Sequence, residues 1–239
     1  MTTMATPARR SKAAPRRAEA ALDICDVALA ADCGGVLYWL EERLLAVADL
    51  HFEKGSSFAS RGVLLPPYDT AATLARLAKL IARYSPRVVV ALGDSFHDGG
   101  GPARLAAADR GTLAKLQRGR DWIWIAGNHD SEPADDIGGT FAHALALGPL
   151  TFRHEPTGSA GEIAGHLHPS ARINWRGRSM VRRCFAADAK CVVMPAFGAY
   201  TGGLSIRDRA FTMIFGAREF AAHVLGERRI YLFSSTHCL

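Results

Sequence analysis

Five apolar stretches of the chain are each followed closely by side chains that can bind a metal ion. The stretches read LLAVA, VVVAL, WIWIA, LTF and EIA. The side chains that follow them, in chain order, are Asp49, His51, Asp94, Asn128, His154, His166 and His168. Core strands have no packing use for carboxylate, amide and imidazole groups at their ends. We therefore interpret the seven residues as a set that serves chemistry.

The types of these side chains indicate which chemistry that is. Carboxylate, imidazole and amide oxygen together suit Mn, Fe and Zn better than Ca or Mg. Because no cysteine belongs to the set, a structural zinc site is disfavoured. Seven ligands are too many for one ion, but they suit two ions that share a bridging carboxylate. Paired ions about 3.5–4 Å apart are an arrangement for hydrolysing phosphate esters.

The individual motifs differ in how specifically they point to function. The pattern Asp-x-His at 49–51 is common by chance, and Gly-Asp at 93–94 also occurs in ordinary strand-to-loop turns. Gly-Asn-His-Asp at 127–130 favours a tight turn that aims the imidazole outward. In Gly-His-x-His at 165–168, two imidazoles of an extended segment would lie on the same side and face one site. These four motifs and His154 together, in this order, indicate a functional site.

The elements that must position these side chains follow from apolar periodicity and turn residues. We expect helices at 66–84 and 102–118. We expect strands at 24–30, 36–40, 44–48, 87–92, 122–126, 143–147, 150–153, 161–164, 171–175, 180–186, 190–194, 211–215 and 229–233. Helices between the early strands, and strands mostly paired later, predict a layered α/β fold with two packed sheets. In such folds the site forms beyond the carboxyl ends of the strands, where the seven residues fall.

The charge is concentrated at the N-terminus. Residues 1–20 hold five basic side chains and one acid, which accounts for +4 of the net charge of +6. This segment is rich in Ala, Arg, Ser, Thr and Pro, so we expect a disordered basic tail over 1–20 and a single domain over 21–239. The domain is close to neutral, so its charge alone is weak evidence for nucleic-acid binding.

Cysteine usage and hydropathy bear on location. The five cysteines form no CxxC pair, and the odd count is typical of reduced thiols in a cytoplasm. Apolar runs are shorter than the roughly 20 residues that span a bilayer. We expect a cytoplasmic protein without a membrane segment.

The ordered motif series, from Asp49-x-His51 to Gly165-His166-x-His168, resembles the calcineurin-like metallophosphoesterases. The short chain, His154-Glu155-Pro156 and the ending GHLHP at 165–169 look most like the bacterial ligase-associated DNA damage response endonucleases. The resemblance implies a four-layer αββα sandwich of two mixed sheets flanked by helices. It places a dinuclear site at one edge of the sandwich.

The resemblance also implies a role for each residue of the set. The first metal ion would be held by Asp49, His51 and His168, the second by Asn128, His154 and His166, and Asp94 would bridge both. The ions would generate a bridging hydroxide that attacks the phosphate. His129 would not bind metal but would donate a proton or hydrogen bond to the departing oxygen. Either Asp130 or Asp49 would orient its imidazole.

Two further features stand beside this pattern. Many relatives carry an acid three positions after the bridging aspartate, followed by arginine, whereas this chain has His97 and then Asp98. His97 is interpreted as a substrate contact, as support for a ligand, or as an exposed loop residue. A basic cluster follows the last histidine of the set and comprises Arg172, Arg176, Arg178, Arg182 and Arg183, with Trp175 among them. It either contacts a nucleic-acid backbone, with Trp175 stacking on a base, or forms a solvated pair of strands.

We therefore expect a two-metal phosphodiesterase or nuclease, acting on DNA in repair, with Mn as the first candidate ion and Fe or Zn as others. The resemblance implies a DNA ligase and a helicase as partners. One alternative is a small-molecule phosphodiesterase or nucleotide pyrophosphohydrolase. Another is a non-catalytic scaffold with the same fold, although a scaffold has no physical need of the seven side chains and His129.

Overall fold

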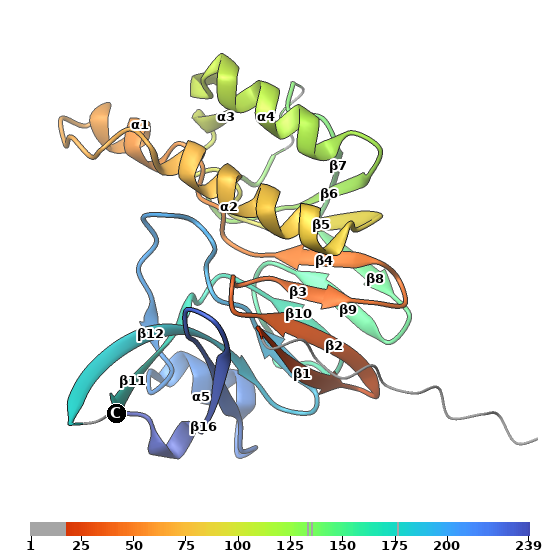
Figure 1. Ribbon diagram of the computed structural model, residues 1–239, viewed down its shortest axis with the longest axis vertical. Helices are drawn as coiled ribbons and strands as arrows, with labels where there is room; N and C mark the ends of the chain where they lie inside the picture. The colour runs from red at the N-terminus through yellow and green to blue at the C-terminus, as the bar shows by residue number, and fades with distance from the viewer. Residues whose placement is uncertain (1–17, 133, 135, 176) are drawn as a thin grey trace, which may run out of the picture.

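The computed structural model describes residues 18–132, 134, 136–175 and 177–239 (Figure 1). The basic tail expected over 1–20 lies outside the described residues up to position 17. The chain is already in a strand from Glu19, so residues 19 and 20 belong to the fold and not to a tail.

The first sheet is built from the N-terminal half of the chain. Its strands follow one another in chain order: β1 (Glu19–Ile24), β2 (Val27–Asp32), β3 (Leu37–Trp39), β4 (Leu44–Val47), β5 (Val88–Leu92), β6 (Asp121–Ile125) and β7 (Thr140–Ala142). Neighbours from β1 to β4 pair antiparallel, and those from β4 to β7 pair parallel. The carboxyl ends of β4, β5 and β6 therefore meet at one edge of the sheet.

Four helices lie along one face of this sheet (Figure 1). They are α1 (Lys54–Ala59), α2 (Asp69–Tyr84), α3 (Gly101–Arg104) and α4 (Ala107–Gln117). Helix α2 buries Leu74, Leu77 and Ile81 in a core shared with β4 and β5. The helix expected at 102–118 is divided, because Leu105 and Ala106 have extended ψ angles of 120° and 144°.

The second sheet comes from the C-terminal half. Its strands are β8 (Ala144–Leu147), β9 (Leu150–Arg153), β10 (Glu162–Ala164), β11 (Pro169–Trp175), β12 (Arg178–Ala187), β13 (Cys191–Val193), β14 (Leu204–Ser205), β15 (Ala221–Leu225) and β16 (Ile230–Ser234). The main path runs β14-β11-β12-β13-β10-β9-β8, and the β15–β16 hairpin joins it through β12. Strands β9, β10 and β13 are parallel, so the carboxyl ends of β9 and β10 also meet at one edge.

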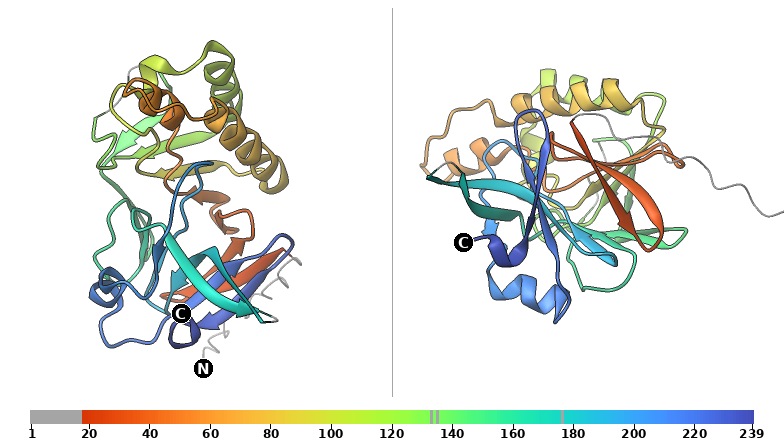
Figure 2. Two further views of the ribbon diagram at one scale, coloured as in Figure 1. Left: turned by 90° about the vertical axis from the view of Figure 1, so that its left-hand side faces the viewer. Right: turned by 60° about the horizontal axis from the view of Figure 1, so that its bottom comes forward.

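Three hydrophobic clusters correspond to the contacts between four layers. The central cluster lies between the two sheets, with Leu44 and Val90 of the first sheet against Phe152 and Phe185 of the second. The helices cover the outer face of the first sheet (Figure 2). Helix α5 (Arg209–Phe215) covers part of the outer face of the second sheet through Phe211 and Phe215. The predicted α/β sandwich of two mixed sheets is confirmed.

Two predicted strands are wrong in detail. The strand expected at 211–215 is helix α5, which begins where the side chain of Asp208 accepts a hydrogen bond from the backbone nitrogen of Ala210, a helix N-cap. The strand expected at 24–30 is a hairpin that turns at Cys25 and Asp26, both with positive φ. Among the described residues, no helix is long and apolar enough to cross a membrane.

Candidate metal centre

The two sheets bring the seven side chains together at one edge of the sandwich, which we call the metal edge: Asp49, His51, Asp94, Asn128, His154, His166 and His168. Strands β4, β5 and β6 lead into Asp49, Asp94 and Asn128 from the first sheet. Strands β9 and β10 lead into His154 and His166 from the second. Backbone bonds join the sheets here, since the nitrogen of Gly198 donates to the carbonyl of Asp49 at 3.0 Å.

One group of potential ligand atoms consists of Asp49, His51 and His168. The Nε2 atom of His168 lies 3.3 Å from Oδ1 of Asp49 and 3.4 Å from Nε2 of His51. Asp49 has 0% of its surface exposed. The backbone nitrogen of His166 donates to both its carboxylate oxygens, at 3.2 and 3.1 Å. A fully buried carboxylate is thus aimed at two imidazoles.

The second group consists of Asp94, His154 and His166, and Asn128 joins it. The Oδ1 atom of Asn128 lies 2.8 Å from Nε2 of His154 and 3.0 Å from Nδ1 of His166. Those two ring nitrogens are 3.1 Å apart. Oδ1 of Asp94 lies 3.4 Å from Nε2 of His154.

Asp94 connects the two groups. Its Oδ1 atom faces His154 of the second group, and its Oδ2 atom lies 3.9 Å from Nε2 of His51 in the first. The carboxylate is 3% exposed and accepts a 2.9 Å hydrogen bond at Oδ1 from the backbone nitrogen of His129. One carboxylate can therefore contribute an oxygen to each group.

The hydrogen bonds of the imidazoles fit cation binding. His154 donates from Nδ1 to the carbonyl of Leu92 at 2.9 Å, which leaves a lone pair on Nε2. That lone pair then points at the acceptor Oδ1 of Asn128, and two acceptors 2.8 Å apart repel each other unless a cation or proton lies between them. Burial, with the neighbouring imidazole of His168, lowers the pKa of His51 to about 2, and burial also lowers the pKa of His166. Neutral imidazoles are the form that binds metal ions.

The backbone at the metal edge is strained. Five of the seven residues have left-handed φ angles: Asp49 at 53°, His51 at 44°, Asp94 at 46°, His166 at 69° and His168 at 47°. Such conformations cost about 1–2 kcal/mol per non-glycine residue and cluster at functional sites. The extended segment expected at 165–168 is therefore wrong, and its two imidazoles join different groups.

Glycines of the motifs allow the close approach of neighbouring loops. A Cβ atom on Gly127 would overlap the backbone nitrogen of Asp94. A Cβ atom on Gly93, whose φ is 72°, would lie 2.5 Å from the ring of His154. The Gly-Asp and Gly-Asn-His-Asp motifs thus have a steric reason at this site.

His129 lies beside both groups without joining either. Its Nδ1 atom donates to the backbone carbonyl of His97 at 2.8 Å, and its Nε2 atom lies 3.9 Å from Oδ2 of Asp94. Neither expected carboxylate makes the contact that orients this ring. Asp130 instead accepts from the backbone nitrogens of Ser95, Phe96 and Gly127. Its burial raises its pKa to about 6.

His97 is half-buried beside the metal edge and is not an exposed loop residue. Its ring stacks between Phe58 of α1 and His129, with centroid distances of 5.6 and 5.2 Å. Its Nδ1 atom lies 3.5 Å from Nδ1 of His51. Burial and the cation of Lys54 lower the pKa of His97 to about 4. Helix α1 was not predicted as an element, although Lys54 and Phe58 were close to the motif at 49–51.

The basic cluster after His168 is divided by the β11–β12 hairpin. Arg172 pairs with Val181, and Arg182 pairs with Ala171, so Arg172 and Arg182 lie on opposite faces. Arg178 shares the face of Arg182. Arg183 is used structurally, because it donates to the carbonyls of Ala196, Phe197, Gly198 and Thr201. Arg176 and the side chain of Trp175 lie outside the described part of the structure.

The two-sheet sandwich, with two carboxylate–imidazole groups at its edge, defines a metal-dependent phosphoesterase. Residues 42–180, more than half of the chain, match the family model of calcineurin-like phosphoesterases. The chain belongs to this family, as its motif series predicted, and it is a hydrolase of phosphate esters.

One solved structure agrees with this assignment. The chain is similar to the Pseudomonas putida nuclease MPE, with 27% identity, a TM-score of 0.68, and coverage of 90% of this chain and 100% of that one. A weaker likeness, with 14% identity and a TM-score of 0.39, covers 80% of this chain and 98% of Yfce, a phosphoesterase from E. coli. The second likeness is too weak to support an inference. No protein with a curated description matches the sequence significantly.

Proposed function

We propose that the protein is a two-metal phosphodiesterase that cuts nucleic acid, with DNA as its substrate. The observation that carries the proposal is the shared carboxylate: Asp94 places one oxygen toward each of two ligand groups. Asp49, His51 and His168 would hold one ion, and Asn128, His154 and His166 the other. Mn is the first candidate for both ions, and Fe or Zn are alternatives, given the mixed oxygen and imidazole donors.

Divalent ions bound there would supply Lewis acidity to a water molecule and neutralise charge on the phosphoryl group. The protein's own contribution is to fix the groups around them. Asp94 is held between the two ligand groups because its Oδ1 atom accepts a hydrogen bond from the backbone nitrogen of His129. His154 keeps the lone pair of Nε2 directed toward the site because its Nδ1–H group donates a hydrogen bond to the carbonyl of Leu92.

His129 is suited to protonate the departing oxygen. Its Nδ1 proton is committed to the carbonyl of His97, so a second proton on the ring resides on Nε2. The side chain is 39% exposed, which leaves Nε2 accessible to a substrate. A positioned imidazole of this kind contributes about 10²–10⁴-fold to a hydrolysis rate when the leaving oxygen is basic.

Nucleic acid is favoured as substrate by the similarity to a nuclease over nearly the whole chain. His97, which stacks on His129, is the first candidate for a substrate contact. Arg172 and Arg178, on β11 and β12, are further candidates. A role in DNA repair, with a ligase and a helicase as partners, rests on the motif resemblance.

A substrate panel tests the proposal. Purified full-length protein with added Mn would be assayed on a nitrophenyl diester, a nitrophenyl monoester and single-stranded DNA. We expect hydrolysis of the diester and the DNA, with the monoester slower. Asp94→Asn should lose both bound metal and all three activities, whereas Asp121→Asn, at the opposite end of β6, should keep them. Turnover of cyclic or dinucleotide substrates without DNA cleavage would favour the small-molecule alternative, and a protein that binds no metal and cuts nothing would be a scaffold.

A further inference from the structure

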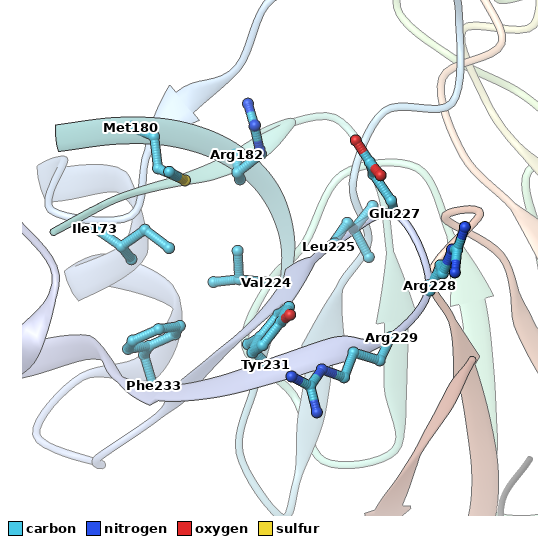
Figure 3. A pocket seen from close by; sticks show the side chains of 11 residues that line it. Ile173, Met180, Arg182, Val224, Leu225, Glu227, Arg228, Arg229, Tyr231 and Phe233 are labelled. Carbon is cyan, nitrogen blue, oxygen red and sulfur yellow. The ribbon is translucent and has the colours of Figure 1, made fainter. Parts of the chain in front are cut away.

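A groove lies on the outer face of the second sheet, and none of the seven metal-edge residues lines it. Figure 3 shows the side chains that do. It forms because β12 pairs with β15 only from Cys184 to Ala187. Beyond the pair Cys184–Val224, the β11–β12 and β15–β16 hairpins separate. The space between them has a volume of about 410 Å³. We call it the arginine groove.

The floor of the arginine groove is apolar and partly aromatic. Ile173 and Met180 come from one hairpin, and Val224, Tyr231 and Phe233 come from the other (Figure 3). Helix α5 covers the neighbouring part of this face through Phe211 and Phe215. Met180, Tyr231 and Phe233 are half-buried, so the apolar surface continues beyond the helix into the groove.

The rim of the groove is positively charged. Of the described residues that line it, Arg182, Arg228 and Arg229 are basic and Glu227 is acidic, which leaves an excess of two positive charges among them. Arg182 has a long hydrogen bond to the carbonyl of Val181, at 3.5 Å, and the guanidinium of Arg229 lies over the ring of Tyr231, at 4.8 Å. All three side chains are exposed, and their forked N–H groups are of the kind that bind phosphate oxygens.

We propose that the arginine groove binds a segment of single-stranded nucleic acid, as an accessory site for the substrate of the proposed nuclease. Sites that bind single-stranded nucleic acid combine a positively charged rim with aromatic side chains. In this groove the phosphates would contact the arginines, and the bases would pack on the apolar side chains. The position agrees with this role. Ala171, the partner of Arg182, follows the ligand residue His168 by three residues, about 10 Å along β11. A single-stranded nucleic acid held in the groove can therefore extend along the β11–β12 hairpin to the metal edge.

Binding of a fluorescein-labelled dT20 oligonucleotide tests the proposal by fluorescence anisotropy. Full-length protein is used without added metal ion so that the probe stays intact. The test variant carries Arg182→Gln, Arg228→Gln and Arg229→Gln. The matched control carries Lys79→Gln, Lys115→Gln and Arg118→Gln, which remove the same charge from exposed positions on or just after α2 and α4.

We expect the groove variant to weaken binding by about tenfold relative to the control. The slope of log K against log salt should fall by about two, since each lost phosphate contact on a single strand contributes about 0.7. Equal affinity and slope in the two variants would overturn the proposal. Thermal unfolding of both variants shows that each is folded.

Two competitors identify the occupant. An abasic oligonucleotide of equal length should displace the probe less well than dT20, because it lacks bases to pack on Tyr231 and Phe233. Displacement by polyglutamate as effective as that by dT20 would instead mean that the groove takes an acidic peptide, and would overturn the proposal. The assay involves no hydrolysis, so a failure of the substrate panel would contradict the proposed function without deciding the groove.

Discussion

At the metal edge the carboxylate and imidazole side chains are buried, mostly on strained backbone, whereas in the arginine groove the charged side chains are exposed on a regular strand and a hairpin turn. Asp49, Asp94 and His154 are each less than 5% exposed, and two of the three have positive φ angles. Arg182 and Arg229 lie in or beside antiparallel hairpins with ordinary ladders. Strand β11 of the second sheet connects the two regions. It begins next to His168 of the metal edge and pairs with β12, which carries Arg182 of the groove.

The difference shows how each region obtains its charge interactions. Groups in the groove remain solvated, so a single arginine contributes little and its contribution is screened by salt. Groups at the metal edge have lost their water, so they interact strongly with a cation but repel one another without it. Substitutions at the metal edge should therefore have large, coupled effects, and substitutions in the groove small, additive ones.

Among substitutions that leave both ligand groups intact, the largest effect should come from His129→Ala. Hydrolysis of substrates with basic leaving groups, such as DNA, should fall by about 10²–10⁴-fold because the proton donor is lost. A nitrophenyl diester has an acidic leaving group and should be affected much less. Metal content should stay at the wild-type level, because His129 belongs to neither ligand group. His143→Ala, at an exposed position before β8, is the control, and equal losses on both substrates would contradict the role of His129.

The sequence predicted the contents of the metal edge because strand ends are visible in it. The apolar runs that became β4, β5, β6, β9 and β10 stop at the residues that converge. Because neighbouring parallel strands have their carboxyl ends at the same edge of a sheet, the side chains that follow them must gather there. The assignment of the family followed from that order of motifs.

The sequence did not predict contacts made by the backbone. The carbonyl of His97 that holds His129 carries no residue-type signal, so a carboxylate was expected in its place. The left-handed angles of His166 and His168 have no glycine to mark them. The segment expected as a strand at 211–215 forms helix α5, whose first turn is capped by the side chain of Asp208.

Removal of the metal ions should destabilise the fold through the metal edge. Ligand atoms such as Nε2 of His154 and Oδ1 of Asn128 would then face each other 2.8 Å apart without a cation between them. At 100 times the dissociation constant, a bound ion adds about 2.7 kcal/mol, which corresponds to roughly 5–10 °C in Tm for a domain of this size. Differential scanning calorimetry with EDTA, and then with Mn restored, measures the shift. A Tm that does not respond to Mn would contradict the proposal that the two groups bind metal ions.

Gly127→Ala should damage the metal edge without removing any ligand. The added methyl group would overlap the backbone of Asp94, and relief of that overlap moves either the carboxylate or the turn that carries Asn128. Overpacking of this kind costs about 1–3 kcal/mol. Gly99→Ala is a matched control, because a Cβ there has nothing within 4 Å. Urea unfolding and metal content are the measurements, and identical behaviour of the two variants would mean that the edge is not tightly packed.

Acid should weaken the metal-free protein through the buried imidazole of His51. The pKa of His51 is lowered to about 2 in the folded state, whereas an unfolded histidine has a pKa of about 6.5. The unfolded state alone therefore takes up this proton between those values, so stability is complete above pH 6.5 and falls by about 1.4 kcal/mol per pH unit below it. Asp130 opposes this trend from about pH 6 down to pH 4, because its raised pKa keeps a proton on the folded state.

The His51→Gln variant isolates that contribution. Urea midpoints at pH 7.5, 6.2 and 5.5, all in EDTA, should decline less steeply for the variant than for the wild type. The same decline in both proteins would show that His51 is protonated in the folded state. It would then not be the neutral ligand that its burial indicates.

The smallest effect should come from a single groove substitution, Arg228→Gln. One exposed contact to a phosphate contributes about 0.2–1 kcal/mol, so affinity for dT20 should fall by only a factor of about 1.5 to 5. The salt slope should decrease by about 0.7, the value for one phosphate contact, and Tm should not change. Lys115→Gln on α4 is the control for charge alone. A loss of affinity as large as that of the triple variant would mean that the three arginines act as one coupled site, as we expect for the buried groups of the metal edge. The contrast between the two regions would then no longer hold.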